Sequence, residues 1–155
     1  MALHQYKLSL TWTGNRGEGT ASYKSYDRSH EIKAGDKPAI PGSSDPSFRG
    51  DPSRYNPEEM LVASLSACHM LWYLHLATTA GVMITAYTDE ATGTMEETAN
   101  GGGRFTEVTL HPVITVKEQS MIAIADTLHE KTNELCFIAN SVNFPVHHQP
   151  TYQVG

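Results

Sequence analysis

The 155-residue sequence predicts one α+β domain in which antiparallel sheets pack on two central helices. Three observations lead to this class. Apolar and polar residues alternate near the start of the chain, a long apolar segment covers residues 57–80, and a second, amphipathic segment covers residues 120–139. The expected order of elements is three strands, a helix, two strands, a helix and a final strand.

The alternation of apolar and polar side chains over residues 6–12 is typical of a half-buried strand. A glycine-rich turn at residues 14–19 is expected to lead into a second strand at 20–26, and a third strand is expected at 30–34. Residues 35–56 contain four prolines and three glycines and are interpreted as a long loop. A loop of this length is often functional, although a surface excursion without a role also fits the pattern.

The first helix has a clear start. Asn56 can cap its N-terminus, Pro57 suits the first helical position, and two glutamates follow where acidic side chains favour the positive end of a helix. Residues 60–88 contain no Asp, Glu, Lys or Arg, which is long enough for a membrane span. Serines, threonines and histidines interrupt this segment, so we expect a helix buried on nearly all sides within protein. One chain is too small to surround such a helix, which indicates a homodimer and no membrane contact.

The second half of the chain contains two strands around a glycine turn at 100–103, where no Gly-Lys-Ser/Thr follows to indicate a phosphate loop. In the second of these strands Pro112 indicates an edge or a bulge. Four apolar residues of that strand are expected on one face: Val108, Leu110, Ile114 and Val116. The helix at 120–139 has an apolar stripe of Met121, Ile124, Leu128, Leu135 and Ile138. The last strand is expected at 147–153.

The composition excludes several classes of protein. The net charge is −6, and Lys and Arg do not cluster, so neither nucleic acid nor an anionic membrane is an expected partner. The amino terminus lacks the basic and apolar regions of a signal peptide. Only two cysteines are present, which excludes a disulfide scaffold and favours the cytoplasm.

These two cysteines carry the main functional question. Cys68 lies near the middle of the first predicted helix and Cys136 near the end of the second, so the thiols can face each other as a redox pair or as an unreactive core contact. An apolar environment raises the pKa of a thiol and makes it inert unless a cation or hydrogen-bond donor is near. The helical neighbours of Cys68 are Leu61, Ser64, Leu65, Leu71, Trp72 and His75.

No metal site is expected from the cysteines and histidines. Cys68 and His75 share a helix face but stand ~10 Å apart along the axis, too far for one ion. His147 and His148 would point to opposite sides of a strand. Neither Cys-x-x-Cys nor His-x-x-x-His occurs.

The segment 56–68, Asn-Pro-Glu-Glu-Met-Leu-Val-Ala-Ser-Leu-Ser-Ala-Cys, resembles the signature of the OsmC/Ohr family, thiol peroxidases that reduce organic hydroperoxides. In that family a cysteine follows ten residues after the glutamate of an Asn-Pro-Glu turn, and Glu58 and Cys68 match this spacing. Cys136 is similar to the family's second cysteine in order and distance. The resemblance covers nearly the whole chain and implies a single OsmC-like domain over 1–155 and an intertwined homodimer.

The resemblance also implies a mechanism. Cys68 would be oxidised by the hydroperoxide to a sulfenic acid, and Cys136 would resolve that acid as a disulfide. An external dithiol, lipoyl or another thiol, would reduce the pair, and no cofactor is required. Such an antioxidant peroxidase belongs to the oxidative stress response.

Further site residues follow from the same resemblance. Glu58 matches the family's supporting glutamate, and Arg16 is the expected arginine, with Arg49 as the alternative. Because Glu58 stands ~15 Å from Cys68 along a straight helix, it would act on the site of the second subunit. The substrate pocket is expected to involve Leu61, Leu65 and Trp72, with core packing as the alternative for each.

Two departures from the family pattern concern the pair itself. Phe137 follows the second cysteine where proline is common, and His69 and Met70 follow the first where an aromatic residue is common. The competing interpretation is a non-catalytic protein on the same scaffold, which binds a small apolar ligand or senses redox state.

Overall fold

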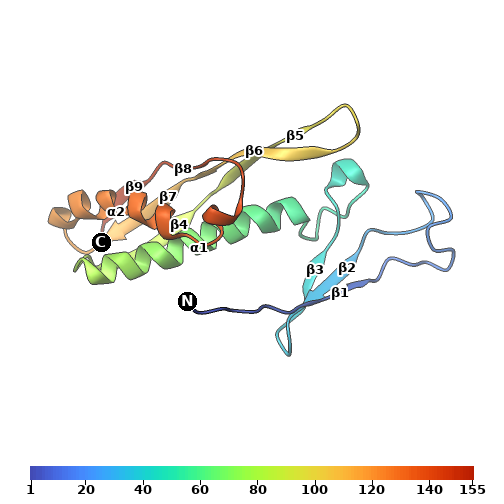
Figure 1. The fold of residues 1–155 in the computed structure, drawn as a ribbon, viewed down its shortest axis with the longest axis horizontal. Coiled ribbons are helices and arrows are strands. Elements are labelled where there is room, and N and C mark those ends of the chain that lie inside the picture. Colours follow the sequence, from blue (N-terminus) through green and yellow to red (C-terminus); the bar gives the residue numbers. More distant parts are fainter. The chain divides into compact units, whose positions relative to one another are not determined.

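The computed structural model describes all residues 1–155 as two compact units, residues 1–61 and residues 62–155. The first unit contains one antiparallel sheet in the order β1-β2-β3, in which Leu10 pairs with Ile32 (Figure 1). Its elements are β1 (Ser9–Trp12), β2 (His30–Lys33), β3 (Ile40–Gly42) and the 3-10 helix η1 (Pro46–Phe48).

The strand predicted at residues 20–26 is wrong, because turns occupy this segment and only the bridge between Asn15 and Tyr26 remains. Short polar side chains satisfy the backbone locally here. The Oδ1 atom of Asn15 accepts hydrogen bonds from the N–H groups of Gly17 and Gly19 at 2.9 and 3.0 Å. Such local bonds compete with a strand ladder.

The loop predicted at 35–56 is only partly a loop, because it contains β3 and η1. The carbonyl of Pro41 accepts a hydrogen bond from the N–H of Tyr55 at 3.2 Å, and the N–H of Ser43 donates to the carbonyl of Tyr55 at 2.9 Å. Proline lacks an N–H and is tolerated in β3 because that strand lies at the sheet edge.

The first unit has no buried apolar side chain. All buried hydrophobic residues of the chain lie in the second unit, and Leu8, Leu10 and Trp12 of the first are 62%, 65% and 43% exposed. A sheet with apolar side chains open to solvent lacks the burial that normally stabilises one.

The first helix, α1 (Pro57–Thr79), begins where the sequence predicts. Asn56 and Glu59 form a reciprocal capping box: the Oδ1 atom of Asn56 accepts from the N–H of Glu59 at 2.8 Å, and the N–H of Asn56 donates to Oε1 of Glu59 at 3.2 Å. The prediction that this helix is buried on nearly all sides is wrong for the single chain. Its buried residues form one narrow stripe of Leu65, His69, Tyr73 and Ala77.

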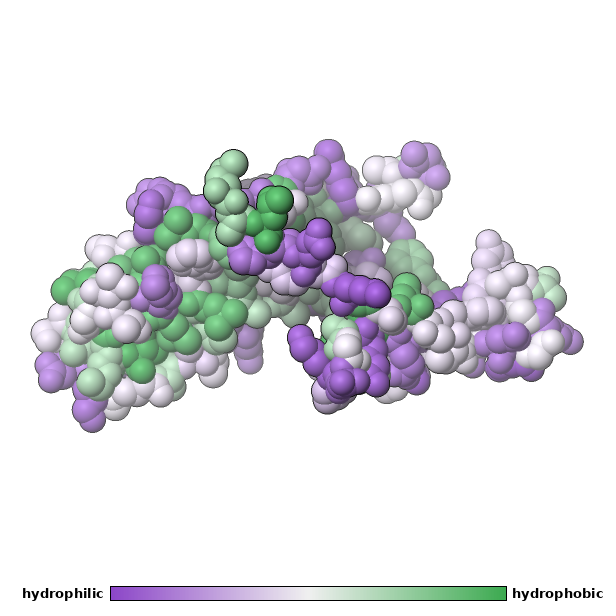
Figure 2. Space-filling model, turned by 60° about the horizontal axis from the view of Figure 1, so that its bottom comes forward, coloured by the Kyte–Doolittle hydropathy of each residue, from purple (hydrophilic) through white to green (hydrophobic).

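One chain supplies too few neighbours to cover the rest of α1, and Leu71 is 63% exposed. By length and composition α1 could cross a membrane, a property that core helices share. Figure 2 shows apolar side chains at the surface of the part of the chain that holds α1 and α2.

The second unit contains two three-stranded sheets, β4-β7-β9 and β5-β6-β8, beside α1 and α2 (Figure 1). Its strands are β4 (Ile84–Asp89), β5 (Thr92–Glu97), β6 (Gly103–Leu110), β7 (Pro112–Val116), β8 (Val146–His148) and β9 (Thr151–Val154). Its helical elements after α1 are η2 (Gln119–Met121), α2 (Ile122–Leu135) and η3 (Ala139–Ser141). The α+β class with two helices is confirmed.

The strand predicted across residues 108–116 is in fact two strands of different sheets. The chain changes sheets at His111, whose N–H donates to Oδ1 of Asp89 at 2.6 Å. The burial prediction is confirmed, because all four apolar residues of the predicted face are at most 1% exposed: Val108, Leu110, Ile114 and Val116.

The final strand predicted at 147–153 is also divided, into β8 and β9. The two strands pair in parallel with β6 and β7 respectively, so the sheets are mixed rather than wholly antiparallel. Helix α2 is shorter than predicted and ends at Leu135. Ile124 is 48% exposed, so the predicted stripe is wrong at that position, and the face that α2 buries holds Ala125, His129 and Thr132.

Two apolar clusters form the core of this unit. One contains Tyr73 and Ala77 of α1 with Ile114 and Val116 of β7 and Ala125 of α2. The other contains Leu65 of α1 with Val108 and Leu110 of β6.

Candidate functional site

The two cysteines meet within the second unit. Cys68 is half-buried on α1, and Cys136 is 1% exposed immediately after the last residue of α2. Both are free thiols, and they lie close enough for Cys68 to contribute to the raised pKa of Cys136. The predicted pair is therefore brought together, and its two members differ in access to solvent.

The environment of Cys136 keeps its thiol protonated. Burial, and to a smaller extent the interaction with Cys68, raise the pKa of Cys136 to about 11. The N–H of Ala139 donates to Sγ of Cys136 at 3.5 Å, which opposes the shift only weakly. At neutral pH Cys136 is thus a protonated thiol.

The predicted pocket residues have different positions. Leu65 is fully buried and packs with Val108, so its side chain belongs to the core. Leu61 is half-buried. Trp72 is half-buried, and its ring meets that of Phe137 edge-on, with centroids 5.5 Å apart.

The two glutamates at the start of α1 differ. Glu59 is exposed, and the capping box accounts for its carboxylate. Glu58 is half-buried and makes no hydrogen bond or ion pair in this structure. Helix capping therefore accounts for the carboxylate of Glu59 but not for that of Glu58.

Three arginines of the first unit are relevant to the predicted site. Arg16 donates to the carbonyl of Lys24 and lies 3.6 Å from Asp27, with its side chain 53% exposed. Arg49 has a left-handed backbone with φ 65°.

Sequence reasoning overlooked Arg54, which lies two residues before Asn56 and is closer than Arg49 to the Asn-Pro-Glu turn. The guanidinium of Arg54 lies 3.5 Å from Glu31 and 3.9 Å from Asp51, and its side chain is only 25% exposed. Its position in the sequence could have identified Arg54 as a candidate, because it is the last cation before the helix.

Sequence reasoning also missed a stack of three imidazole rings, two of them buried, one of which belongs to the residue after Cys68. His69 of α1, His129 of α2 and His148 of β8 have ring centroids 5.3 to 5.8 Å apart. Burial lowers the pKa of His69 to about 4 and that of His129 to about 3, and the neighbouring imidazoles add to both shifts. No group of three His, Cys, Asp or Glu side chains in the structure is arranged to hold a metal ion.

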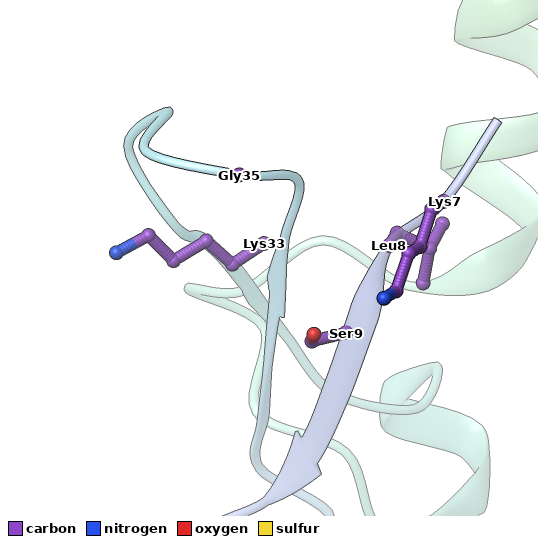
Figure 3. Close-up of a pocket in the computed structure, with 5 residues that line it drawn as sticks. All are labelled: Lys7, Leu8, Ser9, Lys33 and Gly35. Carbon is purple, nitrogen blue, oxygen red and sulfur yellow. The ribbon is translucent and has the colours of Figure 1, made fainter.

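The hollow in Figure 3 belongs to the first unit and contains neither cysteine. It is lined by Lys7, Leu8, Ser9, Lys33 and Gly35. Figure 3 shows Lys33 extended away from β1, so the two lysines do not converge on a common point.

The fold and the thiol pair define an α+β protein with a dithiol centre between a long apolar helix and the end of a second helix. The sequence profile of the family described as OsmC-like protein matches residues 50–150, more than half of the chain. The chain belongs to this family.

Solved structures agree with that assignment. The fold is similar to that of an OsmC-like protein of unknown function from Vibrio cholerae, with a TM-score of 0.85 and 28% identity over 96% of this chain and 100% of the other. An organic hydroperoxide resistance protein from Elizabethkingia anophelis has a TM-score of 0.68 and 21% identity to this chain. The match covers 98% of this chain and 99% of the other. The organic hydroperoxide resistance protein OhrB of Bacillus subtilis has a TM-score of 0.62 and 18% identity to this chain. The match covers 98% of this chain and 100% of the other.

The two hydroperoxide resistance proteins therefore share the fold of this chain over nearly its whole length. No curated protein sequence gives a significant match.

Proposed function

We propose that this protein is a thiol-dependent peroxidase that reduces organic hydroperoxides to alcohols, with Cys68 as the peroxidatic and Cys136 as the resolving cysteine. The observation that carries the proposal is the proximity of these two free thiols, whose interaction contributes to the raised pKa of Cys136. Membership of the OsmC-like family supports a role in hydroperoxide resistance, because two similar folds carry that description.

The unequal exposure of the thiols supports the assignment of roles. A hydroperoxide reaches the half-buried Cys68 before it reaches Cys136, which is 1% exposed. The raised pKa of Cys136 also leaves that thiol protonated at neutral pH, whereas the thiolate is the nucleophile in thiol chemistry.

The reaction has two steps. The thiolate of Cys68 attacks one peroxide oxygen, the O–O bond breaks, and the departing alkoxide takes up a proton to become the alcohol. Cys68 is then a sulfenic acid. The sulfur of Cys136 attacks the sulfur of Cys68, the S–O bond breaks, and the leaving hydroxide takes the proton of Cys136 to become water. An external dithiol, lipoyl or another thiol, reduces the disulfide by exchange.

Other residues have supporting roles in this proposal. The half-buried carboxylate of Glu58 has no partner within its own chain and would hold the activating arginine. Arg16 is the first candidate for that arginine, Arg49 is the alternative, and Arg54 joins them because it is the last cation before the helix. Leu61 and Trp72 would contact the substrate, while Leu65 supports them from the core.

A homodimer in the cytoplasm is part of the proposal. The first unit buries no apolar side chain, and α1 buries only one narrow stripe and leaves Leu71 63% exposed. A second copy that covers these surfaces would supply the missing burial. It would also allow Glu58 of one subunit to act on Cys68 of the other.

The test is consumption of tert-butyl hydroperoxide with dithiothreitol as reductant. Wild type is expected to turn over and Cys68→Ser to lose turnover. In a separate reaction without reductant, Cys136→Ser is expected to form the sulfenic acid of Cys68 without a disulfide. Failure of wild type to consume the peroxide would reject the peroxidase. The second candidate, a protein that binds an apolar ligand or senses redox state, would then be favoured by the open apolar surface of α1.

A further inference from the structure

Phe137 joins the two segments that carry the thiols. It follows Cys136 directly, is 66% exposed, and meets the ring of Trp72 edge-on at an interplanar angle of 89°. Trp72 lies four residues after Cys68, so the two share one face of α1. The contact between these rings therefore seats the segment after α2 on the same helix face as Cys68.

The two residues after Phe137 are held differently. Ile138 and Ala139 pack against the cluster that contains Leu65, which lies three residues before Cys68. The segment after Cys136 thus packs against Trp72 of α1 and against the cluster that includes Leu65 of α1. One of these contacts is with a buried aliphatic core, and the other is an aromatic contact at the surface.

The turn after Cys136 does not need the ring of Phe137 for its own backbone. The carbonyl of Cys136 accepts from the N–H of Asn140 at 3.0 Å, and the carbonyl of Phe137 accepts from Oγ of Ser141 at 2.7 Å. The side-chain amide of Asn140 donates to the carbonyl of Glu134 at 2.8 Å. Removal of the ring would leave this turn intact and release only its contact with α1.

We infer that Trp72 and Phe137 are positioning residues that hold Cys136 against Cys68 so that the disulfide closes. An exposed edge-on ring pair is weak enough to open, because only one side of the contact is packed. Without it, Cys136 would spend less time in bonding geometry with Cys68. The inference rests on the proposed function only where a hydroperoxide is the oxidant.

The first experiment uses diamide, a diazene that oxidises two thiols to a disulfide and becomes the hydrazine by taking up both protons and both electrons. Closure of the disulfide is followed by intact mass as the loss of two hydrogens. We expect Phe137→Ala to close about 3- to 10-fold more slowly than wild type, the range that corresponds to one aromatic pair. Phe137→Tyr keeps the ring and should close at the wild-type rate.

Leu71→Ala is the matched control, because Leu71 is 63% exposed on α1 and truncation there removes similar surface without the ring contact. Equal closure rates in Phe137→Ala and wild type would overturn the inference, as would equal slowing in Leu71→Ala. The equilibrium between the disulfide and dithiothreitol gives a second measurement. The disulfide of Phe137→Ala should be half reduced at a dithiothreitol concentration lower than wild type requires.

A peroxide arm separates this inference from the proposed function. With excess tert-butyl hydroperoxide, the sulfenic acid of Cys68 reacts either with Cys136 or with a second hydroperoxide, which yields the sulfinic acid and another alcohol. Phe137→Ala should accumulate more sulfinic acid while the first oxidation keeps its rate. If wild type does not react with the peroxide, the proposed function is rejected. The rates of disulfide closure with diamide still decide the role of the ring pair.

Discussion

His69 and His129 face each other between α1 and α2, with Nε2 of His69 3.0 Å from Nδ1 of His129 and both side chains 1% exposed. Only one of these two nitrogens carries the proton of the hydrogen bond, so this bond forms when both rings are neutral, while Nε2 of His129 is buried without a partner. Asp89 and Asp126 lie close enough to favour protonation, but burial outweighs them. The pKa values fall to about 4 and about 3.

Stability is therefore expected to decrease in mild acid. Both folded pKa values lie below the ordinary histidine value, so the unfolded chain binds protons first as the pH falls through about 6.5. The free energy of unfolding should drop by roughly 3 kcal/mol between pH 7 and pH 5. Urea denaturation of wild type and His129→Gln over this range measures it. Equal pH slopes in the two proteins would contradict the assignment.

Glu58 and Glu59 offer a matched pair of substitutions one residue apart. Glu59→Ala removes half of the capping box and should cost about 1 kcal/mol of stability while peroxide turnover remains. Glu58→Ala should leave the melting temperature unchanged and lower turnover, because its carboxylate has no partner within the chain. The opposite pattern would remove Glu58 from the site.

The proposed sharing of sites between subunits can be tested by mixing. A Cys68→Ser chain has an intact Glu58, and a Glu58→Ala chain has an intact Cys68. A mixed dimer therefore contains one complete site and should regain turnover in half of its sites. Inactive mixtures, despite exchange of subunits shown by native mass spectrometry, would place Glu58 and Cys68 in the same subunit.

The three candidate arginines are distinguished by single substitutions. Arg16→Ala should lower the rate of peroxide consumption by about 100-fold, as loss of one charged donor does in other active sites. Arg49→Ala should leave that rate unchanged. Arg54→Ala breaks contacts with Glu31 and Asp51. If Arg54→Ala loses turnover and Arg16→Ala keeps it, the activating role belongs to Arg54.

Leu65 and Leu71 test which face of α1 is core. Leu65 is fully buried, so Leu65→Ala should cost about 2 to 5 kcal/mol in urea denaturation. Leu71 is 63% exposed, and Leu71→Ala should change stability by less than about 0.5 kcal/mol. A large loss of stability in Leu71→Ala would mean that a second subunit covers this residue.

Local signals in the sequence were sufficient for some features. Asn56, Pro57 and Glu59 define the start of α1 because a capping box involves only neighbouring residues. The alternation over Val108 to Val116 identified four buried side chains, although it could not reveal the change of sheets at His111. That change depends on Asp89, 22 residues earlier in the chain.

What the sequence alone determined is the family, the α+β class, the first helix and the identity of the thiol pair, because these depend on short motifs and periodicity. Only the tertiary structure decided the parallel pairing of β8 and β9, the exposure of Ile124, the stack of three histidines and the contact of Phe137 with Trp72. Each of these joins segments far apart in the chain or depends on how a helix is rotated against its neighbours. Periodicity identifies an apolar face but does not say which neighbour will cover it.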